Sequence, residues 1–168
     1  MALDKEGNSL WEKVHFADTT AFYPTRSNDL EPTDDGGFIV GGRIWQGEED
    51  DQDAALVKFT DNGDIEWIKE YGSFNWESAV SFQKTPDGGY ILGGGSDHLD
   101  EEGDFYLVKT NESGEMEWEA YLGGPGYQSG VSVDFTQDGG YVISGRAGDP
   151  PFDSDIAMAK CDSLGNQQ

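Results

Sequence analysis

The chain of 168 residues carries 34 acidic and only 10 basic side chains, which gives a formal net charge of −24. A surface of this sign repels polyanions, so the composition argues against nucleic acids and anionic membranes as partners. No run of 18 apolar residues occurs and no signal-peptide pattern precedes the first turn, so we expect neither a membrane span nor a leader.

The first predicted element is a strand over Ser9–Phe16, which follows a turn at Asp4–Gly7. This turn with its downstream tryptophan recurs later in the chain, and the turn alone stands at the C-terminus: Asp61–Trp67, Asn111–Trp118 and Asp162–Gln168. In those later copies the strand before the turn belongs to the same repeat. We therefore interpret residues 1–17 as an orphan outer strand that lacks the inner strands of its own repeat.

An eight-residue segment then recurs three times at nearly constant spacing. It reads DGGFIVGG at Asp35–Gly42, DGGYILGG at Asp87–Gly94 and DGGYVISG at Asp138–Gly145, so successive copies start 52 and 51 residues apart. A second motif of aspartate, apolar residues and lysine keeps this period at Asp53–Lys58, Asp104–Lys109 and Asp155–Lys160. A fixed period near fifty residues is typical of repeat architectures.

Each repeat predicts four short antiparallel strands. In the middle repeat we expect them at Ser78–Thr85, Gly89–Gly94, Asp104–Thr110 and Glu115–Leu122. The Asp-Gly and Asn-x-x-Gly turns between them are hairpin chemistry, because glycine accepts the positive φ that such turns demand. Four strands repeated in line predict an all-β fold, a β-propeller with three four-stranded blades. The blades are expected at 24–72, 73–123 and 124–168, and the last lacks its outer strand.

The pattern within each repeat resembles the kelch repeat. The resemblance rests on the apolar run that ends in a glycine pair, on Phe59 or Thr110 before a turn, and on Trp67 or Trp118 after it. The Asp-Gly-Gly-Tyr-Ile wording is closer to uncharacterised propeller repeats of bacterial secreted and surface proteins. Ser144 replaces the first glycine of the third pair, and the kelch tyrosine is absent. The resemblance implies a propeller and an extracellular or cell-surface location, but no kelch function.

Three blades are too few to close a ring, because closed propellers have about four to eight. The strand Ser9–Phe16 of one chain is expected to pair with Asp155–Cys161 of a second chain, where the outer neighbour is missing. Done reciprocally, this predicts a homodimer with a six-bladed ring, and a nine-bladed trimer is the alternative.

Aromatic residues gather on the loops that one face of a propeller would carry. Tyr23, Trp45, Trp76 and Tyr127 are the candidate ligand-binding residues, accompanied by Phe22, Phe74, His98 and Phe152. Two interpretations remain open: packing between neighbouring blades, or a set of flat platforms for a carbohydrate. Three polar residues share one position on the innermost strand, where they would line a central channel or simply alternate with apolar ones: Glu31, Gln83 and Asp134.

The same loops are acidic, notably at Glu48–Asp53 and Asp97–Asp104. Oxygen-rich loops suit Ca²⁺, but neither loop has the spacing of a calcium-binding loop, so we expect no metal site and no cofactor. The overall acidity is open to three explanations: a surface tuned for solubility, adaptation to high salt, or cation binding.

No catalytic constellation is visible in the sequence. Cys161 is the single cysteine, and no motif places His15 or His98 near it. We therefore expect a non-enzymatic scaffold or binding module that assembles into a closed ring. The alternatives are a lectin-like module that uses the aromatic loops, a calcium-stabilised surface protein and, last, a hydrolase.

Overall fold

The computed structural model describes residues 2–3, 5–13, 15, 23–45, 52–72, 76–97, 103–148 and 155–168, without the side chains of residues 23–26 and 45. Thirteen β-strands and no helix occur among these residues. The described part of the chain therefore holds no helix able to cross a membrane. This confirms the predicted all-β class.

The strands form three large antiparallel sheets and one small one. The first sheet has the order β3-β4-β5-β6, the second β7-β8-β9-β10 and the third β11-β12-β13. The strands of the first sheet are β3 (Tyr23–Pro32), β4 (Phe38–Trp45), β5 (Gln52–Phe59) and β6 (Ile65–Tyr71). Those of the second are β7 (Glu77–Lys84), β8 (Tyr90–Ser96), β9 (Asp104–Thr110) and β10 (Met116–Leu122). Those of the third are β11 (Gln128–Phe135), β12 (Tyr141–Ala147) and β13 (Asp155–Cys161).

The N-terminal strand is shorter than predicted over the described residues. It is β2 (Ser9–Trp11), and it pairs with β1 (Ala2–Leu3) in a two-stranded sheet. In the second sheet, by contrast, the strands begin and end within two residues of the predicted bounds. The repeat motif therefore locates the strands well where all four neighbours are present.

The Asp-Gly-Gly turns are tight hairpins, as predicted. In the second sheet the backbone N–H of Thr85 donates to the carbonyl of Gly89, and that of Gly88 donates to the carbonyl of Thr85, each at 2.9 Å. Gly88 has φ of +90°, which side-chain-bearing residues rarely adopt. The Asp87 carboxylate accepts hydrogen bonds from the Thr85 hydroxyl and the Gly89 N–H, and so holds the turn from inside.

The glycine pair lets backbones approach at two places. A Cβ on Gly94 would lie 1.7 Å from the carbonyl oxygen of Ser78 in the neighbouring strand. A Cβ on Gly93 would lie 2.7 Å from the Cβ of Val133 in the third sheet. Gly93 therefore makes room for a side chain of the next sheet, and Gly94 makes room for the backbone of the neighbouring strand.

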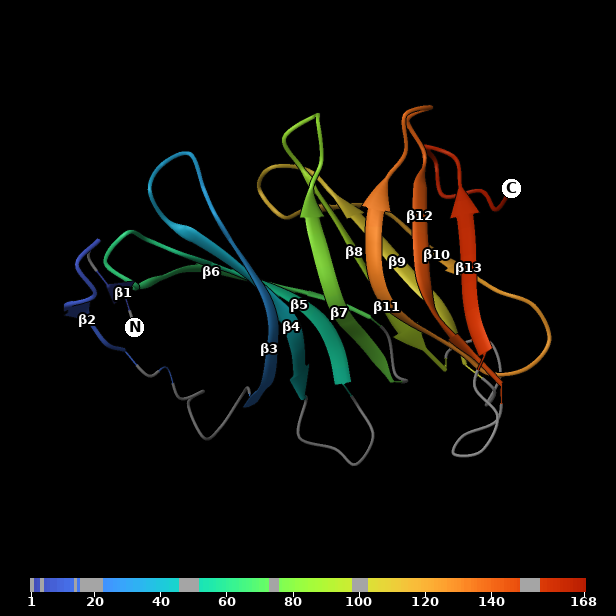
Figure 1. The fold of residues 1–168 in the computed structure, drawn as a ribbon, viewed down its shortest axis with the longest axis horizontal. Coiled ribbons are helices and arrows are strands. Elements are labelled where there is room, and N and C mark those ends of the chain that lie inside the picture. Colours follow the sequence, from blue (N-terminus) through green and yellow to red (C-terminus); the bar gives the residue numbers. More distant parts are fainter. Residues whose placement is uncertain are drawn as a thin grey trace.

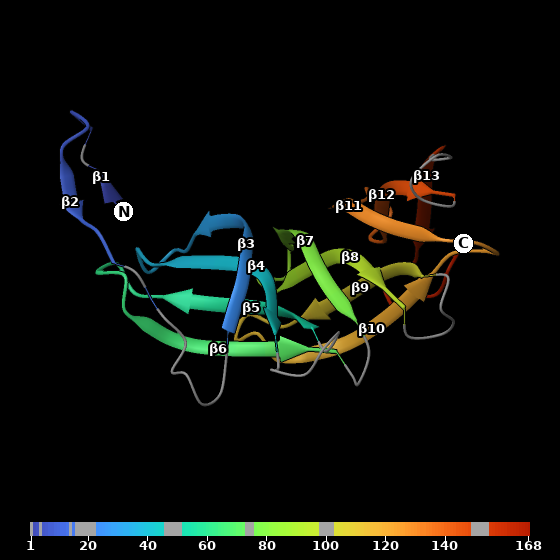
Figure 2. The ribbon, with the colours of Figure 1, turned by 90° about the horizontal axis from the view of Figure 1, so that it is seen from below.

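The three large sheets follow one another in chain order, and the termini lie at opposite ends of the molecule (Figures 1 and 2). One apolar cluster joins the first sheet to the second and includes Ile39, Leu56 and Phe82. Another joins the second sheet to the third and includes Phe105, Leu107 and Ile143. Each sheet is therefore held to the next by its own buried core.

Candidate functional site

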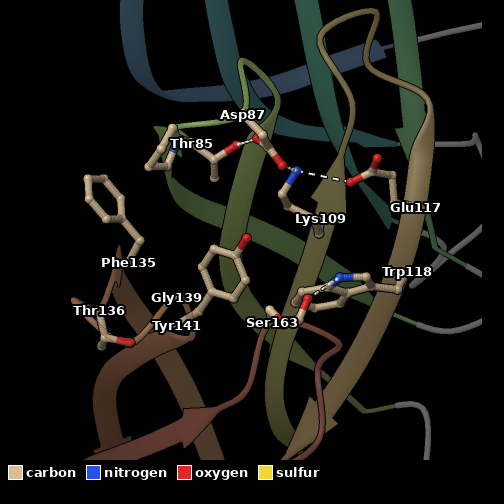
Figure 3. Close-up of a pocket in the computed structure, with 11 residues that line it drawn as sticks. Thr85, Asp87, Lys109, Glu117, Trp118, Phe135, Thr136, Gly139, Tyr141 and Ser163 are labelled. Carbon is tan, nitrogen blue, oxygen red and sulfur yellow. Dashed lines mark hydrogen bonds and ion pairs between the residues drawn. The ribbon is translucent and has the colours of Figure 1, made fainter.

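A groove of about 270 Å³ lies between the second and third sheets, beside the Asp-Gly-Gly turns. Figure 3 shows how its side chains come from both sheets. The second sheet contributes Asp87, Lys109, Glu117 and Trp118, whereas the third contributes Phe135 and Tyr141. The groove therefore exists only because two consecutive repeats are stacked.

Lys109 is the centre of the charged wall. Its side chain is only 3% exposed, and its ammonium lies 2.9 Å from Asp87 and 3.0 Å from Glu117. It also donates to the carbonyl of Thr110 at 2.8 Å, so all three of its N–H groups are engaged. Burial lowers the pKa of Lys109, but the hydrogen bonds to the two carboxylates outweigh this and raise it.

The carboxylates of this triad keep part of their surface in solvent. The side chains of Asp87 and Glu117 are 61% and 47% exposed. Partial burial raises the pKa of Asp87, but hydrogen bonds from Thr85 and Lys109 outweigh it and lower the pKa to about 2. The groove therefore presents the carboxylate oxygens of Asp87 and Glu117 as hydrogen-bond acceptors.

The opposite wall is aromatic. The indole N–H of Trp118 donates to the carbonyl of Ser163 at 3.1 Å, and its ring lies 5.6 Å from that of Tyr141 at 60°. Tyr141 is 7% exposed, and its hydroxyl points toward the Asp87–Lys109 pair (Figure 3). Within the described part of the chain this hydroxyl makes no hydrogen bond, and burial raises its pKa.

A second groove, of about 500 Å³, occupies the same position between the first and second sheets. Its wall residues match those of the first groove one repeat earlier: Asp35, Lys58, Glu66, Trp67 and Tyr90. Lys58 lies 2.8 Å from Asp35 and 3.4 Å from Glu66, and the Tyr90 side chain is 4% exposed. Among the described residues, the Tyr90 hydroxyl also lacks a hydrogen bond. One difference is Lys84, which stands where the first groove has Phe135.

The sequence contained a signal for these grooves. The aspartate of the Asp-Gly-Gly turn and the lysine that ends the second motif recur with the same period, and the structure joins them as ion pairs: Asp35 with Lys58, Asp87 with Lys109 and Asp138 with Lys160. What the sequence could not supply was the distance between turn and strand, which depends on the register of β8 against β9.

The structure brings the predicted aromatic residues together in pairs. Tyr23 and Trp45 are direct partners of β3 and β4, although their side chains are not described. Trp76 and Tyr127 both line a pocket of about 260 Å³ with Asp97. The backbone N–H of Trp76 donates to Asp97 at 2.8 Å. The predicted Phe22, Phe74, His98 and Phe152 lie outside the described residues, as do the acidic positions 48–51 and 100–102.

The Tyr127 side chain is held by contacts with Arg146 of the third sheet. Arg146 donates to its hydroxyl at 3.2 Å and lies 5.3 Å from the centre of its ring. A ligand role for the Trp76 and Tyr127 pair therefore stays a prediction, alongside packing between repeats.

The three residues proposed to line a channel do share one position. Glu31, Gln83 and Asp134 lie in β3, β7 and β11, the first strand of each sheet, opposite Ile39, Ile91 and Val142. Glu31 and Gln83 are half-buried and Asp134 is exposed. Their register is equal, and their place along a channel stays a prediction.

The two ends of the molecule carry apolar faces that the interior repeats cover. Leu30 is 57% exposed, whereas Phe82 and Val133 at the same repeat position are 0% and 2% exposed. This first-sheet surface, the front face, continues into an apolar groove of about 540 Å³ that includes Phe38 and Val40. At the other end, Ile156 and Met158 are 90% and 68% exposed, although their equivalents Phe105 and Leu107 are fully buried. We call this third-sheet surface the rear face.

The N-terminal segment is attached to the first sheet by the contacts that join complete repeats. A Cβ on Gly63 would lie 2.7 Å from the ring of Trp11, and one on Gly114 would lie 2.8 Å from that of Trp67. His15 then contacts the carbonyl of Gly63 at 2.7 Å, as the Tyr71 hydroxyl contacts that of Gly114. Trp11 and His15 thus contact the first sheet as Trp67 and Tyr71 of β6 contact the second.

The single cysteine and the possible metal ligands show no arrangement that indicates reactivity or metal binding among the described residues. Cys161 is fully buried, and burial raises the pKa of its thiol, which opposes nucleophilic reactivity. Across the described residues, no three His, Cys, Asp or Glu side chains are grouped to hold a metal ion. Comparison of the chain with protein-family models gives no match, and a search of curated proteins gives none either.

Proposed function

We propose that this protein is a non-enzymatic scaffold, a three-bladed β-propeller segment that closes a six-bladed ring with a second copy of itself. The observation that carries the proposal is the pair of apolar end faces. Each is exposed at positions where the interior sheets are fully buried, and each is the counterpart of the other in the repeat. A second chain could therefore cover the front face as the second sheet covers the core of the first, and its own front face could cover the rear face.

The interpretation as a propeller is supported by the way each sheet contacts the next. The backbone N–H of Phe82 lies 3.4 Å from Asp29 of the preceding sheet, and that of Val133 lies 2.9 Å from the hydroxyl of Ser81. Asp29 and Ser81 occupy one repeat position, opposite the first glycine of each pair. The same displacement thus relates both pairs of sheets, as in the radial repetition of propeller blades.

The end faces are suited to a second copy because both continue interfaces that already exist within the chain. The rear face of one chain would cover Leu30 of the other, as the second sheet covers Val133 of the third sheet. None of the described strands lies beside the outer edge of β13 over Asp155–Ala159, and an unpaired edge with exposed apolar side chains favours association. Two identical junctions give two-fold symmetry, the commonest symmetry of soluble homo-oligomers.

Light scattering on the purified chain tests this assembly. The ring requires a mass near twice the 18.4 kDa of one chain, whereas a nine-bladed trimer gives three times that value. Ile156→Asp and Met158→Asp should each restore the single-chain mass. Because these side chains are exposed in one chain, the substitutions spare its own core.

Met116→Asp is the matched control. Met116 is 51% exposed in the second sheet, and its equivalent Ile65 is 42% exposed in the first, so this position is exposed even where both neighbours are present. The control should keep the mass of the wild type. A folded wild-type chain of single mass at all concentrations would refute the ring.

A further inference from the structure

We propose that the grooves between consecutive sheets are binding sites for neutral pyranose sugars, with one sugar at each sheet interface. This goes beyond the scaffold role and does not depend on ring closure, because both walls of each described groove belong to one chain. The groove between the second and third sheets carries most of the argument (Figure 3).

The charged wall selects a ligand that brings hydrogen-bond donors. The ammonium of Lys109 is buried and fully engaged, so it has no donor to offer. The half-exposed carboxylates of Asp87 and Glu117 each accept from Lys109 through one oxygen and keep further acceptor capacity. A ligand facing this wall must therefore present hydroxyl or N–H groups rather than acceptors alone.

The Tyr141 hydroxyl adds a polar group that has no partner in the described chain. Tyr141 is 7% exposed, and its hydroxyl is not one of the fully buried unpartnered atoms of the described residues, so this oxygen faces the open groove and can meet a ligand there. Because the hydroxyl both donates and accepts, it suits a sugar hydroxyl, which does the same. An equally buried tyrosine, Tyr90, stands at the same place in the other groove.

The aromatic wall selects a ligand with one apolar side. Trp118, Phe135 and Tyr141 line the groove opposite the carboxylates. A pyranose has a face of C–H groups and a rim of hydroxyls, so it can contact the rings and the carboxylates together. The net charge of −24 repels acidic sugars, which restricts the class to neutral ones.

The two grooves should differ in affinity. Lys84 replaces Phe135 in the groove between the first and second sheets and is ion-paired with Asp34 at 2.7 Å. This substitution removes part of the apolar wall and leaves a larger, more polar groove. We expect the Tyr141 groove to bind more tightly than the Tyr90 groove.

Titration with methyl α-D-glucopyranoside, methyl α-D-galactopyranoside and methyl α-D-mannopyranoside, followed by amide chemical shifts in NMR spectra, tests the proposal. At least one of them should shift the amides of Asp87, Gly88 and Tyr141. Tyr141→Phe removes only the hydroxyl and should weaken binding about 2- to 10-fold, the equivalent of one hydrogen bond. Tyr90→Phe should affect only the weaker site.

Tyr106→Phe is the control, because the Tyr106 hydroxyl donates to Glu119 at 2.8 Å and Tyr106 lines neither groove. Methylammonium chloride serves as a cationic probe with N–H donors but no sugar ring. The proposal is overturned if none of the three glycosides shifts the groove amides, if the double variant Tyr90→Phe, Tyr141→Phe binds as well as the wild type, or if methylammonium shifts the same amides and the glycosides do not. The mass of the assembly is measured separately, so failure here leaves the ring untouched and the reverse also holds.

Discussion

The position shared by Leu30, Phe82 and Val133 allows one substitution, to alanine, to be compared in three environments. Phe82 is 0% exposed, so Phe82→Ala should cost about 3–5 kcal/mol of unfolding free energy. Val133 is 2% exposed and smaller, and its loss should cost about 2 kcal/mol. Both values are independent of assembly, because the covering sheets belong to the same chain.

Leu30→Ala is the informative member of the series. In a single chain the side chain is 57% exposed, so truncation removes less than half of the roughly 1.5–3 kcal/mol that full burial provides, or about 1 kcal/mol. In the closed ring the rear face of a second chain covers it, and the cost should rise to about 3 kcal/mol per chain. The difference of about 2 kcal/mol measures the junction itself.

Urea unfolding followed by tryptophan fluorescence, at several protein concentrations, provides the assay. For a ring, the unfolding midpoint of the wild type rises with concentration, and Leu30→Ala reduces that dependence. Phe82→Ala lowers the midpoint equally at every concentration. If Leu30→Ala costs no more than about 1 kcal/mol at concentrations where the wild type has twice the single-chain mass, the front face is not the junction.

Three further predictions concern charge. Lys109→Met leaves two carboxylates facing each other and should lower the free energy of unfolding in urea by about 1–3 kcal/mol. Lys160 is 37% exposed and has one acidic partner, so Lys160→Met should lower it by less than about 1 kcal/mol. Equal losses would contradict the role of burial. The pKa of Asp87 is about 2 in the folded chain and 3.8 ordinarily, so the stability that its ionised form contributes is present above pH 3.8 and is lost as pH falls toward 2. Asp87→Asn should therefore make the unfolding midpoint depend less on pH over that window. If the midpoint of the variant falls with pH as steeply as that of the wild type, Asp87 does not make this contribution. With a net charge of −24, NaCl and KCl should raise the melting temperature alike by screening; a larger rise with CaCl₂ at equal ionic strength would instead reveal cation sites.

The strands and turns could be predicted from the sequence because their determinants are local and repeat. The Asp-Gly-Gly motif fixes a hairpin at each copy, since glycine supplies the positive φ and the aspartate accepts hydrogen bonds from the turn. The strand β9 was predicted at Asp104–Thr110 and is found there. The shorter N-terminal strand illustrates the limit, because among the described strands β2 is paired with β1 alone.

The grooves and end faces could not be predicted with the same certainty, because they depend on how two sheets meet. Alternation within β13 leaves open which of Ile156 and Ala157 faces the preceding sheet. The structure shows that Ala157 packs against the core shared with the second sheet, whereas Ile156 is 90% exposed. Only the stacking direction of the sheets distinguishes a buried position from an exposed one of equal hydrophobicity.

The junction of the proposed ring differs from the interior interfaces at one more position. Gly41 and Gly93 make room for Phe82 and Val133 of the following sheet, but Ser144 stands at the corresponding place in the third sheet. A partner's Leu30 would therefore meet an additional side chain. Leucine branches one carbon further from the backbone than valine, so it can turn aside, at some loss of packing. The junction should be weaker than the interior interfaces.

The C-terminal turn limits the junction further. Gln167 pairs with Cys161, and the N–H of Gln168 donates to the carbonyl of Lys160 at 2.9 Å, so the chain itself fills the start of the outer strand beside β13. In the repeat, Gln168 is followed by the position of Trp11. The hairpin of β1 and β2 therefore occupies the same repeat positions as residues 160–168. At a junction of the proposed ring, the hairpin of one chain and residues 160–168 of the other would compete for one place. Closure of the proposed ring would therefore require one of these two segments to detach at each of the two junctions, and we expect this cost to weaken the assembly and make it depend on protein concentration.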